Sequence, residues 1–422
     1  MKKKQTLLKV AMELIKDPKF LFNIGQQIGV AGVIGENRNR LVLFLACLTS
    51  AQEKPVSILV KGPTGSGKNN LVKAGLSVVP KEVLITRSSF SDKALAHGDT
   101  KLTQKIVYIA EHRAGKHAEF FRRLLQSEGE LHHEATVVAG AMRGTEVASR
   151  VGAPVFLSTT TDDKVYPDDE TRFLSLRADE SSEQTREVVR AQFSGESQKE
   201  PVQLAAWHEV FRVLCKKIPI IRHPSWFGYL AERIPASEPR ARRDVPRFLS
   251  LLKAVTLCRS YADGRRAKAE EIEITFADYC VAFQILADSF SSTFSAAHPL
   301  SLQVAAHVRE LHSNFKRPII VEELVKAMGW KKQLVYKWLA DAVKHNLVTL
   351  SAGTHANNRK MYVPSELRPT SFLPEPQTLL DECAELDAVV HYEDPLTGDT
   401  CTLRRKLRKE GRKNCHQKSK LA

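Results

Sequence analysis

The chain has 422 residues, enough for two or three domains with separate hydrophobic cores. Its hydrophobic content of 43% and charged content of 26% are ordinary for a globular protein and exclude a low-complexity chain. The 63 Lys and Arg residues exceed the 48 Asp and Glu residues, which gives a formal net charge of +15. This excess favours an anionic partner, most commonly nucleic acid. A generally basic, solvated surface is the alternative that charge alone leaves open.

Seven cysteines are scattered along the chain without a C-x-x-C pair, which argues against a disulfide framework and a structural zinc site. Cys47, Cys258 and Cys280 lie in apolar helical patterns and are expected to be buried thiols. No uninterrupted apolar run follows the basic start, and none is long enough to cross a bilayer. We therefore expect a cytoplasmic protein with no membrane partner.

After an N-terminal segment expected to be helical, residues 62–70 read GPTGSGKNN, which is typical of a phosphate-binding loop. An apolar run at 57–60 predicts a buried strand before it, and the spacing at 69–79 predicts a helix after it. The glycines let backbone N–H groups converge on a phosphate, and Lys68 reaches the terminal phosphates. Asn69 stands where a Ser or Thr hydroxyl normally meets Mg²⁺, and its amide oxygen is a weak Mg²⁺ ligand. The expected nucleotide contacts are Gly62, Pro63, Thr64, Gly65, Ser66, Gly67, Lys68, Asn69 and Asn70.

Four further apolar runs follow, at residues 83–86, 106–109, 155–158 and 173–176, with helical or polar segments between them. This alternation predicts an α/β core in which a parallel sheet carries helices on both faces. Functional side chains should lie just beyond the carboxyl ends of the strands.

Residues near the ends of these runs are the catalytic candidates. Ala110 stands where nucleotide hydrolases usually hold a metal-binding Asp, and Glu111 is the candidate to polarise the attacking water. A helix-start acid with a structural role is the alternative for Glu111. The run at 155–158 is followed by three threonines, of which Thr160 is the candidate contact to the nucleotide. Arg172 directly precedes the run at 173–176.

In this order the stretches resemble the AAA+ ATPases, most of all the helicase-type modules of primase-related proteins from plasmids, phages and integrated elements. The matching segments are GENRNRLVLFLACLTS, GPTGSGKNNLV, IVYIAEHRAG, RRLLQSEGEL, FLSTTTDD and DDETRFLSLRADESSEQT. The resemblance implies ATP and Mg²⁺ as cofactors, with Lys68 and Glu111 as catalytic groups and a sensor among residues 159–161. It also implies that Arg172 acts on the site of a neighbouring subunit in a ring. Ala110 departs from the family pattern of a carboxylate at that position.

Residues 131–151 interrupt the core with two β-prone halves, which predicts a hairpin with a basic tip at Arg143. In helicase-like AAA+ proteins such a hairpin points into the ring channel and touches DNA. A hairpin that serves only the fold is the alternative.

From residue 201 to 290 the apolar spacing is helical and suits the helical lid that follows an AAA+ core. Arg242 and Arg243 begin one of these helices. Arg243 is the candidate lid contact to the nucleotide, and a solvated arginine is the alternative.

Residues 298–364 show three helical patterns and a β-hairpin, and Gly329 breaks the second helix from the third at helix-turn-helix spacing. These features predict a winged helix, with Leu334, Val335, Trp338 and Leu339 in its core. A protein-contact module is the alternative to DNA binding. The candidate DNA contacts on the third helix and the wing are Lys331, Lys332, Gln333, Lys337, Arg359 and Lys360.

The last residues predict a small hairpin with a turn at 395–398, and then a basic, disordered tail able to contact phosphates. We expect five parts: a helical segment 1–54, an ATPase core 55–198 with the hairpin 131–151, a lid 199–292, a winged helix 298–366 and an extension 367–422.

The sequence thus predicts a ring-forming AAA+ ATPase that binds DNA and unwinds or remodels it in the replication of a mobile element. A primase or a replication initiator is a candidate partner. The second hypothesis is an ATP-binding DNA-binding regulator with weak or no hydrolysis, and the third is a structural adaptor with a degenerate site.

Overall fold

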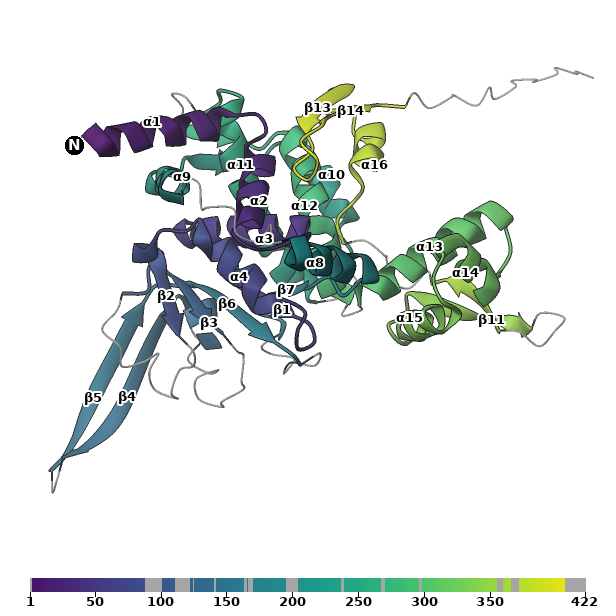
Figure 1. The fold of residues 1–422 in the computed structure, drawn as a ribbon, viewed down its shortest axis with the longest axis horizontal. Coiled ribbons are helices and arrows are strands. Elements are labelled where there is room, and N and C mark those ends of the chain that lie inside the picture. Colours follow the sequence, from purple (N-terminus) through teal and green to yellow (C-terminus); the bar gives the residue numbers. More distant parts are fainter. Residues whose placement is uncertain are drawn as a thin grey trace, which may run out of the picture.

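The computed structural model describes residues 2–87, 101–110, 122–123, 125–139, 142–162, 165, 170–194, 204–236, 239–266, 270–295, 298–354, 360–365 and 372–406. Within them a parallel sheet, a body of helices, a long hairpin and a smaller helical module are arranged as Figure 1 shows.

The sheet is five-stranded and parallel, in the order β2-β3-β6-β1-β7. The predicted α/β core is therefore confirmed; β3 coincides with its apolar run, and the ends of the other strands differ from theirs by one or two residues. Its strands are β1 (Ile58–Lys61), β2 (Leu84–Arg87), β3 (Ile106–Ile109), β6 (Val155–Thr160) and β7 (Leu174–Arg177).

Both faces of this sheet are buried. Successive side chains of a strand point to opposite sides, so neighbouring residues belong to different cores. Ile58 and Val60 belong to a large core that the sheet shares with helices. Leu59, between them, belongs to a smaller core on the other face together with Val107 and Phe156.

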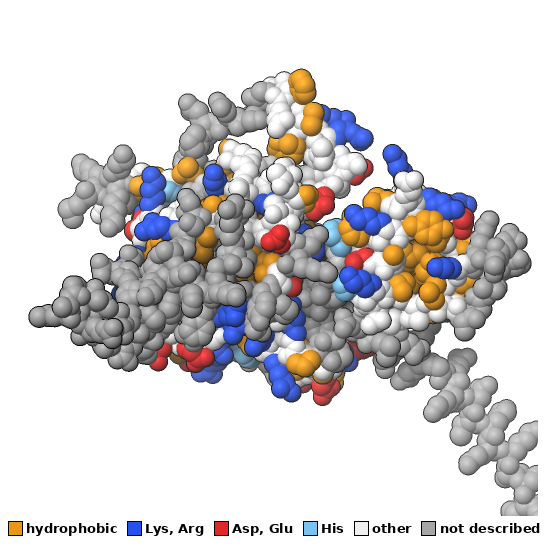
Figure 2. Space-filling model, turned by 90° about the horizontal axis from the view of Figure 1, so that it is seen from below, with side chains coloured by type: hydrophobic (Ala, Val, Ile, Leu, Met, Phe, Trp, Pro, Cys, Tyr) orange, Lys and Arg blue, Asp and Glu red, His pale blue; other side chains and the backbone are white. Residues whose placement is uncertain are grey.

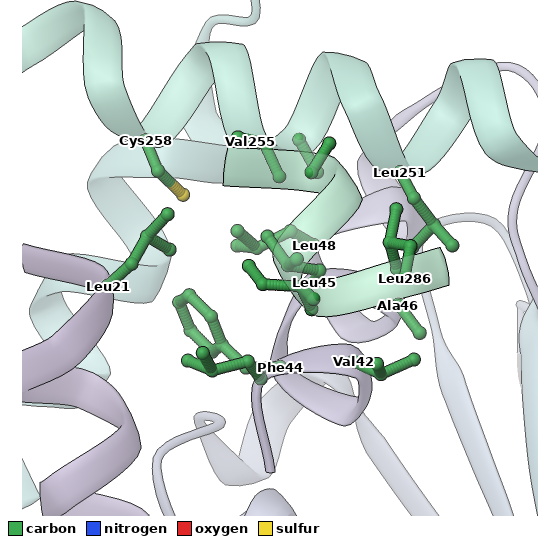
Figure 3. Close-up of a cluster of buried hydrophobic side chains, with 14 of the residues drawn as sticks. Leu21, Val42, Phe44, Leu45, Ala46, Leu48, Leu251, Val255, Cys258 and Leu286 are labelled. Atoms are coloured by element: carbon green, nitrogen blue, oxygen red, sulfur yellow. The ribbon is translucent and has the colours of Figure 1, made fainter. Parts of the chain in front are cut away.

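The large core joins the N-terminal helices to those of the expected lid. Figure 3 shows Leu21 of α2, Leu45 of α3, Leu251 of α11 and Leu286 of α12 in one cluster. The described residues between 2 and 54 and between 204 and 295 thus share one core, in which Cys47, Cys258 and Cys280 are buried as predicted. No helix in the described part of the chain has the length and apolar character that a membrane crossing requires. The helices are α1 (Lys2–Lys16), α2 (Phe20–Val30), α3 (Asn37–Leu48), η1 (Thr49–Ala51), α4 (Lys68–Ser77), η2 (Lys81–Val83), α8 (Ser182–Ser194), α9 (Leu204–Lys216), α10 (Phe227–Arg233), α11 (Ala241–Ala262) and α12 (Phe276–Ser295).

Two strand pairs stand apart from the main sheet. β4 (Glu130–Ala139) and β5 (Met142–Val151) pair antiparallel over their full length, and their hairpin projects from the body in Figure 1. Two short strands among the helices of residues 204–295, β8 (Ile220–Arg222) and β9 (Glu271–Glu273), pair in parallel with each other.

Residues 298–365 form a module with a core of its own. In α15, the buried residues Val335, Trp338, Leu339 and Ala342 follow helical spacing along one face. Leu334 lies off that stripe and is 38% exposed, so its predicted place in the core is wrong. The elements are α13 (Pro299–Phe315), β10 (Ile319–Ile320), α14 (Val321–Met328), α15 (Lys332–Lys344), β11 (Val348–Thr354) and β12 (Lys360–Pro364), with the sheet order β10-β12-β11.

Beyond this module the chain returns to the large core. Phe372 stacks on Phe290 of α12 with ring centroids 5.6 Å apart, and its backbone N–H donates to Ser291 Oγ at 3.0 Å. The segment continues through α16 (Pro376–Glu382) to a hairpin of β13 (Val389–Glu393) and β14 (Thr400–Arg404), as the turn at 395–398 predicted. The module at 298–365 is therefore an insertion into the main body. The basic tail from residue 407 lies outside the described residues.

Candidate functional site

The glycine-rich loop connects β1 to α4 at the carboxyl edge of the sheet. Gly65 and Gly67 have φ values of 87° and 82°, which glycine adopts at little cost. Helix α4 begins at Lys68, and its first turn holds no acidic side chain. Its first N–H groups have no partner within the helix, and the helix dipole favours negative charge there. The loop therefore has the geometry of a phosphate site.

Lys68 is held inside this loop. Its side chain is buried, and its Nζ donates to the Pro63 carbonyl oxygen at 2.6 Å. Burial lowers the pKa of Lys68, while the negative charge of Glu180 opposes the shift. A backbone carbonyl gives up such a contact readily, because it carries no net charge. The Lys68 ammonium is thus placed to pair with a terminal phosphate.

Asn69 is tied to the ends of two neighbouring strands. Its Oδ1 lies 2.8 Å from Thr159 Oγ1 at the end of β6, and the Thr159 hydroxyl also contacts the Ala110 carbonyl oxygen after β3. A hydroxyl has one proton to donate, so it serves either the amide or the carbonyl at one time. The contact holds Asn69 at the carboxyl edge of the sheet, beside the Ala110 carbonyl group.

The groups around the loop fit a nucleotide with Mg²⁺ in part. The backbone N–H groups and Lys68 fit its phosphates, and Asn69 offers one oxygen to the metal. No group of three His, Cys, Asp or Glu side chains suited to a metal occurs in the described part of the chain. Mg²⁺ at this site would take its remaining ligands from nucleotide oxygens and water, as it commonly does.

The contact to Asn69 comes from Thr159, whereas Thr160 accepts a bond from the Asp162 backbone N–H at 3.1 Å. The alternation of side chains along β6 could have predicted that Thr159, and not Thr160, faces α4. Val155 and Leu157 of β6 lie in the core that contains Leu71 of α4, so residue 159 has the same parity and faces α4. Glu111, the predicted catalytic base, lies outside the described residues.

Sequence reasoning missed Lys61 and Glu170, which connect the base of the loop to α11. Lys61, the last residue of β1, is 2% exposed and forms an ion pair with Glu170. Arg240 donates to the Glu170 backbone carbonyl at 3.3 Å. The sequence signal was a lysine ending a buried strand, where a lysine needs a partner.

The two candidate arginines lie beside the same segment. Arg172 Nε donates to Ser127 Oγ at 3.3 Å, and Arg243 donates to the Thr171 hydroxyl. Arg243 thus contacts the residue that precedes Arg172 in the chain, and Arg172 itself contacts Ser127.

The candidate DNA contacts of the inserted module are exposed. Lys331, Lys332, Gln333 and Lys337 line the outer side of α15, where Lys332 pairs with Glu322 at 2.9 Å. Figure 2 shows hydrophobic side chains among Lys and Arg side chains on this part of the molecule. Lys360 of β12 is also exposed. Arg359 and the side chain of Arg143 in β5 lie outside what the structure describes.

Loop, sheet and helix together define a P-loop nucleotide-binding protein. The family model of the MTBMA_p00010 P-loop domain matches residues 9–221, just over half of the 422 residues, and the chain belongs to that family. The match begins in α1, which agrees with the common core of the N-terminal helices and the sheet. The search of curated proteins found no match to this sequence.

Proposed function

We propose that this protein is an AAA+ ATPase that hydrolyses ATP with Mg²⁺ and uses it to unwind or remodel DNA in the replication of a mobile element. It acts as a ring of identical subunits, with a primase or a replication initiator as its partner. Lys68 neutralises the terminal phosphates, Glu111 activates the water, and Arg172 completes the site of the neighbouring subunit.

The observation that carries this proposal is the strand order. β6 lies between β1 and β3, so the polar end of β6 is adjacent to the loop on one side and to Ala110 on the other. A sensor residue and a water-activating residue would then face the terminal phosphate from neighbouring strands. This is the arrangement expected from the AAA+ resemblance.

DNA binding by residues 298–365 is supported by their shape and charge. Three helices and a small antiparallel sheet, in the chain order α13-β10-α14-α15-β11-β12, have the order of a winged helix, in which α15 takes the recognition position. Its exposed lysines suit phosphate contacts, and the net charge of +15 suits a polyanionic partner.

One observation favours a second function, an ATP-binding DNA-binding regulator with weak hydrolysis. Ala110 offers only its backbone carbonyl where a carboxylate would bind the metal, and Asn69 replaces the usual hydroxyl. Weak Mg²⁺ binding would leave nucleotide binding intact and slow hydrolysis.

Steady-state ATPase activity with and without DNA tests the proposal. We expect turnover that DNA stimulates, and its loss in Lys68→Ala. Lys73→Ala is the matched control, because Lys73 is an exposed lysine of the same helix. ATP turnover that persists in Lys68→Ala would contradict the nucleotide site, whereas tight ATP binding without turnover in the parent protein would favour the regulator.

A further inference from the structure

A second cleft lies at the end of β1 opposite to the phosphate-binding loop. Its volume is about 410 Å³, within the range of small-molecule sites. Residues 51–54 before β1, residues 218–223 around β8 and one face of α11 surround it. Ile218, Ile221 and Leu249 give it an apolar wall.

Two lysines and a histidine line this cleft: Lys54, Lys253 and His223. None of them has an ion-pair partner among the described residues, and the acid that also lines the cleft, Glu53, forms no ion pair there either. Nearby cations behave differently. Arg222 pairs with Glu271, and Lys217 pairs with Glu270. The cleft thus holds two lysines, a histidine and one glutamate, none of them in an ion pair with a described residue.

His223 lies close enough to Lys253 to feel its charge. Burial and the charge of Lys253 both lower the pKa of His223. The positive charges of protonated His223 and Lys253 repel each other. An anion bound between the two side chains would stabilise both charged forms.

We propose that this cleft binds the phosphate group of an organic phosphate, with Lys54, His223 and Lys253 as its cationic contacts. The apolar wall takes the organic part of the ligand. The phosphate belongs either to a small ester or to a nucleic-acid backbone, which carry the same chemistry. The site is separate from the nucleotide site of the proposed function and does not depend on it.

The imidazole signal of His223 in the full-length protein, labelled with ¹³C at histidine, provides the test. His223→Gln identifies the signal, which reports on this cleft and not on the P-loop. Phenyl phosphate added at constant ionic strength should raise the pKa of His223, because a nearby anion favours the imidazolium. Lys253→Gln should raise that pKa in the free protein and weaken phenyl phosphate binding by about tenfold or more. Lys217→Gln, outside the cleft, should change neither.

A short DNA duplex in place of phenyl phosphate separates the two sources. Saturation by phenyl phosphate alone assigns the cleft to a small ester, and saturation by the duplex alone assigns it to a nucleic-acid backbone. A His223 signal that responds to neither, or responds equally in Lys253→Gln, would overturn the proposal.

Discussion

Asn69, which stands where such loops usually have Ser or Thr, changes the hydrogen bonds that are available to the residues around it. A Ser or Thr at this position would donate and accept through one hydroxyl oxygen, whereas the amide has an acceptor oxygen and a separate donor nitrogen. If the Thr159 proton goes to the Ala110 carbonyl, the Asn69 amide can donate to Thr159 and turn its oxygen toward the loop. Thr159 would then act as a positioning residue for the single protein ligand of Mg²⁺.

Thr159→Val tests this at the residue scale, because it keeps the size of the side chain and removes its hydroxyl. We expect the Mg²⁺ concentration for half-maximal binding of a fluorescent ATP analogue to rise by about tenfold, the lower end of the usual effect of a supporting group. Binding without Mg²⁺ should be unchanged. Thr159→Ser keeps the hydroxyl and should behave like the parent. An unchanged Mg²⁺ dependence in Thr159→Val would show that Thr159 does not position Asn69.

At the scale of the element, α15 combines a buried stripe with a basic outer side. Burial of Val335, Trp338 and Leu339 fixes which way the helix faces. The lysines are then exposed by default, and Lys337 lies with its Nζ 4.2 Å from the centre of the Trp338 ring. The exposed Tyr336, 47% accessible, sits among these lysines. A surface of this kind suits nucleic acid, because lysines contact phosphates and aromatic rings stack on bases.

Replacing Lys331, Lys332 and Lys337 together by Ala should weaken DNA binding and flatten its dependence on salt. Affinity falls with salt, so the slope of log affinity against log salt is negative. Removing each lysine that binds a phosphate should make this slope less steep by about 0.9 for duplex DNA. Fluorescence anisotropy at several salt concentrations measures both quantities. The control removes the same charge from other elements, by replacing the exposed lysines Lys73, Lys216 and Lys326. Equal effects in the two triple variants would assign the change to net charge and contradict a specific surface on α15.

At the scale of the whole molecule, the chain leaves the main body after α12 and returns to it at Phe372. The inserted module has its own core, and residues 372–403 complete the large one. Both connections meet α12, because Phe372 contacts Phe290 and Ser291. Thr293 of the same helix bonds with the Ser175 backbone of β7, the strand that follows Arg172. The helix that leads into the module therefore also contacts the strand beside β1.

Phe372→Ala should destabilise the main body by about 3–5 kcal/mol, as is usual for a buried phenylalanine. Urea denaturation followed by circular dichroism measures the change. Val389→Ala, at a position 39% exposed in the same segment, should cost no more than about 0.5 kcal/mol. If Phe372→Ala had the same midpoint as the parent, residues 372–406 would be an appendage of the main body and not part of its core.

The ring is tested by mixing subunits. Glu111→Gln should keep ATP binding and lose about 10²–10⁴-fold in turnover, since the amide lacks the basicity needed at the water. Arg172→Ala should also lose turnover, and mixing it with Lys68→Ala should restore part of it. In the mixture, a subunit with intact Lys68 lies beside a neighbour that supplies Arg172.

Turnover of Glu111→Gln at the parent rate, together with no recovery in the mixture, would exclude the motor. A binding switch would then be the better description, in keeping with the missing carboxylate at Ala110.

The sequence by itself determined what depends on local pattern. Apolar runs that alternate with helical spacing are enough for a buried parallel sheet, and glycines before a lysine are enough for a phosphate loop between a strand and a helix. The hairpins at 130–151 and 389–404 were likewise predictable, because two β-prone runs around a short turn pair locally.

The tertiary structure alone decided what depends on contacts between distant segments. Alternation along β6 indicates that Thr159 and not Thr160 faces α4, but the position of β6 beside β1, which brings Thr159 to Asn69, depends on the strand order. The pairing of Lys61 with Glu170 crosses 109 positions of sequence. Residues 372–403 contain few hydrophobic residues, yet they pack on α12. They do so because the chain returns from the inserted module to the helix that it left. Each of these contacts forms only when the sheet and helices are assembled, since burial of a charge or an aromatic ring is a property of the packed core and not of the segment that supplies it.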